Sequence, residues 1–203
     1  KKIKFLSKDN LEKKIKFKFG KKNILTTFHP ETLTNKYKNE SFKYLLQALK
    51  KIDEASIIFT LPNVDAGSDK IRKMIKTFVK SNKKKYIAFK SMGDELFLSA
   101  MKHSDLVIGN SSSGIIEAPC FNIPTINIGD RQQGRVQAKS IINTKLNKLS
   151  ISKSLKIAFL KKKKMNNIKN PYDIKNTSKK IFNILKKTEI KNLIKKKFND
   201  IDF

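Results

Sequence analysis

One stretch of the sequence has the residue types of an anion-binding turn. Residues 108–119 read Ile-Gly-Asn-Ser-Ser-Ser-Gly-Ile-Ile-Glu-Ala-Pro, which is the end of an apolar strand, a run of small hydroxyl residues and the start of a helix. The first N–H groups of a helix lack internal partners, and the helix dipole is positive there. Ser111 and Ser112 are therefore candidate ligands of a diphosphate, and Glu117 could accept both hydroxyls of a ribose. The alternative is a Ser-capped helix with an exposed glutamate.

A second stretch concentrates the few arginines. Residues 129–135 read Gly-Asp-Arg-Gln-Gln-Gly-Arg and hold Arg131 and Arg135, two of the three arginines in the chain. A planar guanidinium can clamp a phosphate or pair with a carboxylate in a way that lysine cannot. The stretch therefore indicates a phosphate contact, and the alternative is a polar loop with a local Asp130–Arg131 pair.

Two further candidates lie at the ends of predicted strands. His29 follows an apolar run and is held by the next residue, a proline, so it could donate to a leaving phosphate or move a proton; a lone histidine in such a place is also often structural. Asn63 could hydrogen-bond a sugar or a phosphate, whereas we expect Asp65 to cap the following helix. His103, at a predicted helix C-terminus, is interpreted as structural.

The rest of the sequence predicts no metal and no cofactor. Its two histidines and its single cysteine, Cys120, are far apart in sequence, so they lack metal-ligand spacing. A single cysteine also allows no intramolecular disulfide. No P-loop, GxGxxG or GxSxG pattern occurs.

The elements that must position these residues alternate along the chain. Apolar residues at helical spacing, as in 42–52, follow short apolar runs with little alternation, which are typical of parallel strands covered on both faces. The predicted fold class is therefore α/β, a doubly wound Rossmann-like parallel sheet, with the polar candidates at the carboxyl ends of its strands. The predicted strands are 22–28, 56–61, 85–89, 105–109 and 124–128, and the predicted helices are 39–53, 69–80, 94–103, 112–121, 150–160 and 177–187.

The charge is large but unevenly placed. The 203 residues carry a net charge of +29, mostly from lysine, with a hydrophobic content of 38%. Residues 91–137, which hold the main motifs, contain three basic and five acidic residues, whereas residues 151–203 contain 16 lysines and four acids. We interpret the excess as solvated surface and expect no nucleic-acid partner. No apolar run approaches the roughly 20 residues of a membrane span, so we expect a cytoplasmic protein with no membrane contact.

Taken together, the motifs resemble those of the UDP-N-acetylglucosamine 2-epimerase family, and the match is better to its hydrolysing branch, which serves sialic and legionaminic acid synthesis. The resemblance implies a two-domain enzyme of the GT-B arrangement, of which this chain is the C-terminal half. The matching residues are Phe28-His29-Pro30, Pro62 to Ser68, Ile108 to Gly114 with Glu117, and Gly129 to Arg135.

The resemblance also implies roles for single residues. His29 would be the catalytic histidine that faces the sugar and its leaving phosphate, and the backbone around Lys90–Met92 would contact uracil. The UDP and substrate contacts would come from Asn63, Met92, Asn110, Ser111, Ser112, Gly114, Glu117 and Arg131, with support from Asp130, Gln132 and Arg135. The reaction would eliminate UDP and hydrate the resulting 2-acetamidoglycal, releasing a free sugar inverted at C2.

The resemblance sets expectations for domains and partners as well. Residues 1–21 would be an interdomain linker, 22–187 the UDP-binding domain, and 188–203 a basic tail that can be helical. The partners would be a UDP-sugar substrate, the missing N-terminal domain and a second copy in a homodimer, and the chain alone would be inactive. The alternatives are a non-hydrolysing epimerase, a GT-B glycosyltransferase and, in a different class, a basic nucleic-acid-binding module.

Overall fold

Six parallel strands form the centre of the structure, a computed structural model that describes residues 4–30 and 38–189. The strands are β1 (Lys22–Thr27), β2 (Ala55–Thr60), β3 (Tyr86–Phe89), β4 (Leu106–Gly109), β5 (Thr125–Ile128) and β6 (Ile141–Thr144). Their order in the sheet is β3-β2-β1-β4-β5-β6, and every neighbouring pair is parallel. The predicted fold class, a doubly wound Rossmann-like sheet, is confirmed, and β6 is a strand that the sequence analysis did not predict.

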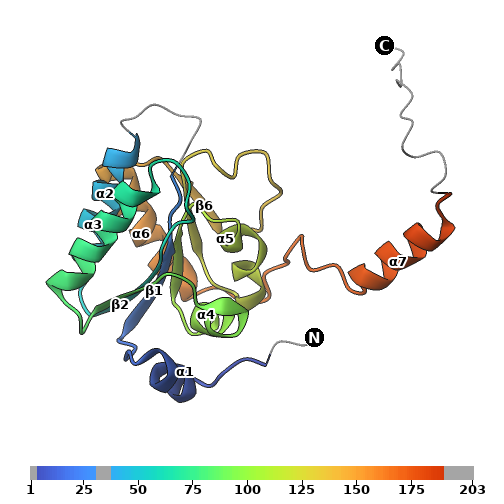
Figure 1. The fold of residues 1–203 in the computed structure, drawn as a ribbon, viewed down its shortest axis with the longest axis horizontal. Helices are drawn as coiled ribbons and strands as arrows, with labels where there is room; N and C mark the ends of the chain where they lie inside the picture. Colours follow the sequence, from blue (N-terminus) through green and yellow to red (C-terminus); the bar gives the residue numbers. More distant parts are fainter. Residues whose placement is uncertain (1–3, 31–37, 190–203) are drawn as a thin grey trace, which may run out of the picture. The chain divides into compact units, whose positions relative to one another are not determined.

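Helices cover both faces of this sheet (Figure 1). One face packs against α2 (Lys38–Lys50), α3 (Ser68–Ser81) and α6 (Lys148–Lys162), and the other packs against α1 (Lys8–Ile15) and α4 (Gly93–Lys102). The strands alternate between the two cores: Ile57 and Phe59 of β2 join the first, whereas Ile58 between them joins the second. Both faces are apolar, which is why these strands show little alternation in the sequence.

The short helix α5 (Ser113–Ile116) and a following 3₁₀ turn (Ala118–Phe121) replace the single helix that was predicted for 112–121. That prediction was wrong because Pro119 cannot donate a backbone hydrogen bond and disfavours the α conformation in the residue before it. The chain leaves this turn through Asn122, which has a positive φ of 54°.

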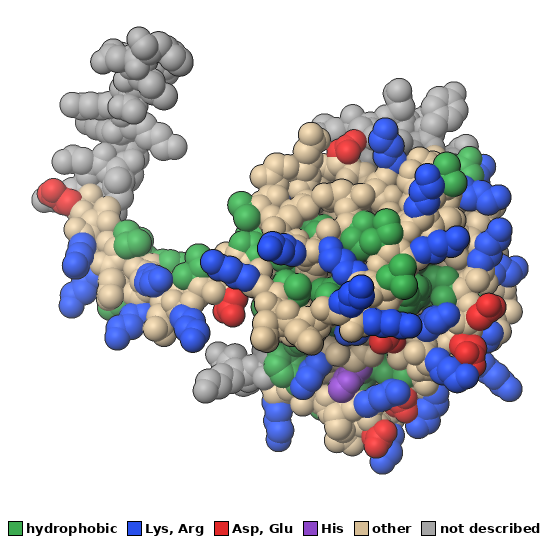
Figure 2. Space-filling model, turned by 180° about the vertical axis from the view of Figure 1, so that it is seen from behind, with side chains coloured by type: hydrophobic (Ala, Val, Ile, Leu, Met, Phe, Trp, Pro, Cys, Tyr) green, Lys and Arg blue, Asp and Glu red, His purple; other side chains and the backbone are tan. Residues whose placement is uncertain are grey.

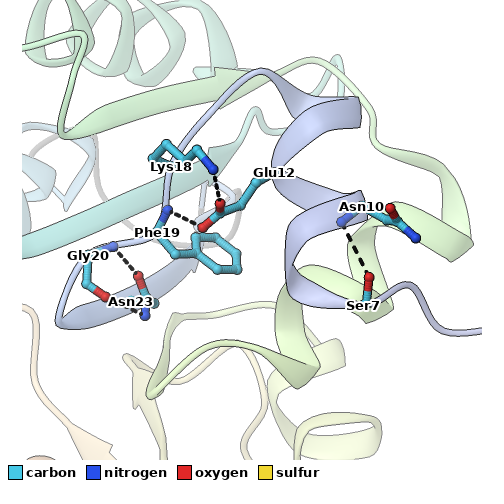
Figure 3. A network of polar contacts seen from close by, with 7 residues as sticks. All are labelled: Ser7, Asn10, Glu12, Lys18, Phe19, Gly20 and Asn23. Atoms are coloured by element: carbon cyan, nitrogen blue, oxygen red, sulfur yellow. Dashed lines mark hydrogen bonds and ion pairs between the residues drawn. The ribbon is translucent and has the colours of Figure 1, made fainter.

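The segment predicted as a linker, residues 1–21, contains α1 and a network of polar contacts (Figure 3). Ser7 Oγ caps α1 by accepting from Asn10 N–H at 3.3 Å. Glu12 is 6% exposed, and its carboxylate accepts from Lys18 Nζ at 2.7 Å and from Phe19 N–H at 2.9 Å. Burial raises the pKa of Glu12, but these two hydrogen bonds and the positive charges of Lys18 and Lys8 together lower the pKa below its usual value. The carboxylate therefore ties α1 to the chain that enters β1.

The chain divides into two compact units, residues 1–171 and 172–203. The second unit contains α7 (Thr177–Lys187), which confirms the helix predicted for 177–187. The predicted domain limits at 22 and 187 stay predictions, and residues 190–203 of the predicted tail lie outside the described residues. Within the described ranges, no helix has the length and apolarity that a membrane span requires.

Candidate functional site

The strand order of the sheet reverses between β1 and β4, which is its topological switch point. From β1 the chain adds β2 and β3 on one side, and then returns to add β4, β5 and β6 on the other. In open α/β sheets, ligands bind outside the carboxyl ends of the strands at this switch point. His29 follows β1 and Asn110 follows β4, so these two predicted site residues lie at the switch point.

Asn110 holds the two strand ends together. Its Oδ1 accepts from His29 N–H at 2.7 Å, and its Nδ2 donates to His29 C=O at 2.8 Å. Its backbone N–H donates to Thr27 C=O at 3.1 Å, and its backbone carbonyl accepts from Arg131 and Gln132. Asn110 is 0% exposed. With this burial and these partners, Asn110 positions His29 and the loop that carries Arg131, and its predicted contact with the substrate stays a prediction.

Gly109 allows this junction to form. Its φ is +144°, and a Cβ at this position would lie 1.8 Å from Thr27 C=O. Only glycine accommodates both the backbone conformation and the approach of β4 to β1. Gly114 has a related role in α5, because a Cβ there would lie 2.7 Å from the Thr125 side chain of β5. The glycines of the 108–119 motif thus bring the serine turn close to the sheet.

The serine turn between β4 and α5 has its own internal contacts. Ser111 Oγ accepts from Ser113 Oγ at 2.9 Å, and Ser112 is the N-terminal cap position of α5. Because α5 has only four residues, its dipole is small. An anion at this turn would therefore be held by hydroxyl and backbone N–H donors rather than by a helix dipole.

His29 is 9% exposed, and its Nδ1 is buried without a hydrogen-bond partner among the described residues. Burial lowers the pKa of His29, the positive charge of Arg131 lowers it further, and Asp65 acts in the opposite direction. The imidazole is therefore neutral at pH 7, so it is suited to a neutral hydrogen bond or to accepting a proton.

Glu117 immediately follows α5 and is partly buried. Its Oε2 is buried and finds no partner in the described part of the chain. Burial raises the pKa of Glu117; a backbone hydrogen bond acts against this, and the charge of Asp94 adds to it. Asp94 lies in the first turn of α4, two residues after Met92, the cap position of that helix. The loop before α4 and the turn after β4 thus approach each other near Glu117.

The loop after β2 is the third segment near the switch point. Asn63 is exposed there, and Arg72 of α3 donates to the Pro62 carbonyl at 2.8 Å, which holds the loop. The capping role predicted for Asp65 is wrong: α3 begins after Gly67, whose φ is +84°, and the helix has no side-chain cap. His103 agrees with its predicted structural role, since its Nε2 lies 2.9 Å from the Leu6 carbonyl.

The loop after β5 carries the remaining predicted residues. Arg131 and Gln132 both donate to the Asn110 carbonyl, at 3.0 and 2.9 Å, and Gln132 is 2% exposed. Gln132 thus holds the loop after β5 against the end of β4, and its predicted role in substrate binding stays a prediction. Arg135 and Asp130 are exposed on the same loop.

A cavity of about 570 Å³ lies beside this loop, at the carboxyl ends of β5 and β6. Of the predicted site residues, only Asp130 lines it. The sequence analysis missed the carboxamides of its wall, although Asn127 interrupts the apolar run of 124–128 and is a visible signal. Across the described ranges, no group of three or more metal-ligating side chains occurs.

Known proteins resemble this chain in sequence and in fold. The model of the family described as UDP-N-acetylglucosamine 2-epimerase matches residues 2–186. The chain is 41% identical over 149 residues to the GDP/UDP-N,N'-diacetylbacillosamine 2-epimerase (hydrolyzing) of Campylobacter jejuni. The aligned residues make up 73% of this chain and 39% of that protein. It is also 38% identical over 151 residues to the polysialic acid biosynthesis protein P7 of Escherichia coli. That alignment spans 72% of this chain and 38% of the Escherichia coli protein.

The chain therefore spans about two fifths of the length of these curated relatives. The S. aureus MnaA–UDP co-structure has the same fold, with a TM-score of 0.65 and 20% identity over 90% of this chain and 48% of that chain. Because the family model covers nearly the whole sequence and the motif residues converge at the switch point, the chain belongs to the UDP-N-acetylglucosamine 2-epimerase family.

Proposed function

We propose that this chain is the nucleotide-binding half of a hydrolysing UDP-sugar 2-epimerase. One observation carries the proposal: His29, the serine turn and Glu117 gather at the switch point of the sheet, and both His29 Nδ1 and Glu117 Oε2 are buried without partners among the described residues. Buried polar atoms without partners are rare in folded proteins and are common at ligand sites. The curated relative from Campylobacter jejuni, which is named as hydrolyzing, supports this branch.

Different residues of the site would bind the diphosphate, the ribose and the uracil of UDP. The hydroxyls of Ser111 and Ser112 and the nearby N–H groups would bind the diphosphate, and Arg131 would add a positive charge. Glu117 would accept hydrogen bonds from the ribose, and the backbone near Met92 would contact the uracil. Together these contacts stabilise the negative charge that UDP gains as it leaves.

The proposed reaction is an elimination followed by a hydration. A base removes the proton from C2 while the bond between C1 and the UDP oxygen breaks, which gives a 2-acetamidoglycal and UDP. Water adds its oxygen at C1 and a proton returns to C2 on the opposite face, so the net reaction consumes one water and releases a free C2-inverted sugar. The neutral His29 would hydrogen-bond the leaving phosphate or the sugar. We assign the base to the half of the enzyme that this chain does not contain.

The chain is expected to bind UDP, and calorimetric titration of UDP into the chain tests this. Ser112→Ala and Glu117→Ala should each weaken binding roughly tenfold or more, because each removes hydrogen bonds to UDP, some of them to charged groups. Ser152→Ala is the matched control, because Ser152 lies on α6, which covers the opposite face of the sheet from α1 and α4. Equal UDP binding in all four proteins would refute the proposed site.

The different-class alternative is a basic nucleic-acid-binding module. On the face of the molecule in Figure 2, Lys and Arg side chains are spread over the surface with acidic side chains between them, rather than gathered in one stripe. A titration with a short oligonucleotide at several salt concentrations separates the two functions. Oligonucleotide binding that weakens with salt by the slope of several lysine–phosphate contacts, without UDP binding by the folded chain, would support the alternative.

A further inference from the structure

Asn110 holds His29 and Arg131 at one point of the switch region. Its carboxamide makes two hydrogen bonds to the His29 backbone, at 2.7 and 2.8 Å, and its backbone carbonyl accepts from Arg131 Nη1 at 3.0 Å. Asn110 is fully buried, so it is a fixed point for both partners. The imidazole of His29 and the guanidinium of Arg131 are therefore held near each other, although they come from the loops after β1 and β5.

The imidazole of His29 is enclosed by the protein but is not satisfied by it. His29 is 9% exposed, and its Nδ1 is buried with no hydrogen-bond partner among the described residues. A buried polar atom without a partner is unfavourable. A ligand oxygen beside this ring would provide a partner once Nδ1 carries a proton to donate, since a protonated histidine has a donor on each ring nitrogen.

Arg131, by contrast, is exposed and uses only part of its hydrogen-bonding capacity. A guanidinium has several N–H donors, and in the described part of the chain only Nη1 has a partner, the Asn110 carbonyl. The other donors suit the diphosphate of the proposed ligand, because a guanidinium and a phosphate match in geometry. A ligand can therefore reach Arg131 from solvent without breaking its bond to Asn110.

Two charged groups of the described residues act on His29, and they oppose each other. Arg131 belongs to the loop after β5, and Asp65 belongs to the loop after β2. Burial lowers the pKa of His29, Arg131 lowers it further, and Asp65 raises it. In the free chain burial and Arg131 together outweigh Asp65, so the imidazole is neutral at pH 7.

A diphosphate bound at Arg131 would reverse this balance. Its negative charges offset the charge of the guanidinium, so that the field of Asp65 at His29 is no longer opposed. A phosphate oxygen near the ring also favours the imidazolium directly, since an opposite charge nearby stabilises the charged form. Both effects raise the pKa of His29 in the complex.

We infer that a diphosphate bound at Arg131 charges His29: the imidazole takes up a proton from solvent as the nucleotide sugar binds, and returns it to solvent when UDP leaves. This inference rests on the proposed function. It gives Arg131 a second role, because its charge keeps His29 neutral until the ligand arrives. The neutral imidazole that first meets the phosphate thus becomes a cation in the complex, where it stabilises the charge of the leaving group.

Calorimetric titrations in buffers of different ionisation enthalpy measure the proton uptake. UDP-N-acetylglucosamine is the ligand to use, because both of its phosphates are esterified and it lacks the phosphate that titrates near about pH 6 in a monoester. We expect about half a proton or more per bound ligand at the pH of greatest uptake. A parallel titration with UDP tests the proposed function itself.

Three variants separate His29 and Arg131 from other causes. His29→Gln should abolish the uptake, and His103→Gln is the matched control, because His103 is at the C-terminal end of α4 and bonds to the Leu6 carbonyl. Arg131→Gln should move the pH of greatest uptake upward, since His29 then takes up a proton more readily without the ligand. If Arg131→Gln weakens binding and leaves that pH unchanged, Arg131 only binds the ligand and the inference is wrong.

NMR separates His29 from other groups that can titrate on binding, such as Glu117. The chain has two histidines, so the imidazole C–H signals give two pH titrations. The titration of His29 should move to higher pH with the ligand, and that of His103 should stay in place. An unchanged His29 titration, or proton uptake that persists in His29→Gln, would overturn the inference while the proposed function stands. A folded chain that binds neither UDP nor UDP-N-acetylglucosamine would overturn both.

Discussion

At the scale of single residues, Glu117, the proposed ribose ligand, shows how a buried carboxyl can oppose stability. Its carboxyl has a raised pKa in the folded chain because of burial, with Asp94 adding to the effect. Below the pKa that Glu117 has in the unfolded chain, its carboxyl is protonated in both states and does not affect the free energy of unfolding. As the pH rises through the window between the unfolded and folded pKa values, the folded chain binds more protons than the unfolded chain, so stability falls.

We therefore expect Glu117→Gln to raise the melting temperature at pH 7 relative to the unaltered chain, and to have little effect at pH 4. The same variant should bind UDP roughly tenfold more weakly, because an amide is a poorer acceptor for two ribose hydroxyls. Differential scanning calorimetry at the two pH values measures the first effect and UDP titration the second. An equal change of melting temperature at both pH values would contradict the role of ionisation.

Residue types and spacing predicted much of the site but not the burial of its members. The strand ends placed His29, Asn63, the serine turn and the arginine loop at one edge of the sheet, and the structure brings their backbones there. Residue types and spacing could not show that Asn110 is fully buried, since this depends on its hydrogen bonds to His29, 81 residues earlier. The same dependence hid the pairing of Asn127 with Asn143.

At the scale of elements, the approach of β4 to β1 depends on Gly109. Gly109→Ala should destabilise the chain by about 3 kcal/mol or more, because its Cβ would meet the Thr27 carbonyl and its φ is unfavourable for alanine. Gly93→Ala is the control: Gly93 also has a positive φ, +66°, but nothing lies within 4 Å of a Cβ there. That change should cost about 1 kcal/mol.

Urea denaturation followed by circular dichroism measures both variants. A similar loss of stability in the two would mean that φ alone, and not the contact with β1, requires glycine at position 109. An unfolded Gly109→Ala beside a folded Gly93→Ala would agree with the prediction.

Elements with clear local spacing could be predicted, whereas those that depend on tertiary contacts could not. Helix α7 was predicted at its observed limits because its apolar residues keep helical spacing. Strand β6 was missed because Asn143 and Thr144 follow only two apolar residues, and its pairing with β5 is a tertiary contact. Helix α1 was missed because lysines dominate its segment, and packing of Leu11 and Ile15 against α4 stabilises it instead.

At the scale of the whole molecule, the net charge of +29 sets the response to salt. Like charges repel more strongly in the compact chain than in the extended one, and salt screens this repulsion. The melting temperature should therefore rise by roughly 4 °C or more between 20 and 300 mM sodium chloride. Lys83→Glu combined with Lys84→Glu, at two exposed positions, should make this rise smaller.

Differential scanning fluorimetry across the salt series would show this. A melting temperature that is independent of salt would mean that the lysines are too far apart to repel each other appreciably. In that case the charge would have no net effect on the stability of the fold.

The hydrogen bonds between Asn110 and His29 also determine when, during synthesis, the proposed UDP site can form. The two residues are 81 positions apart, and β2 and β3 lie between them in the chain. During synthesis, β1, β2 and β3 emerge first and can pair with each other while His29 still lacks its partner. Arg131 and Gln132, which complete the contacts of Asn110, emerge later still. We expect a growing chain to remain unable to hold UDP until β4 and the loop after β5 have left the ribosome, however early its first strands fold.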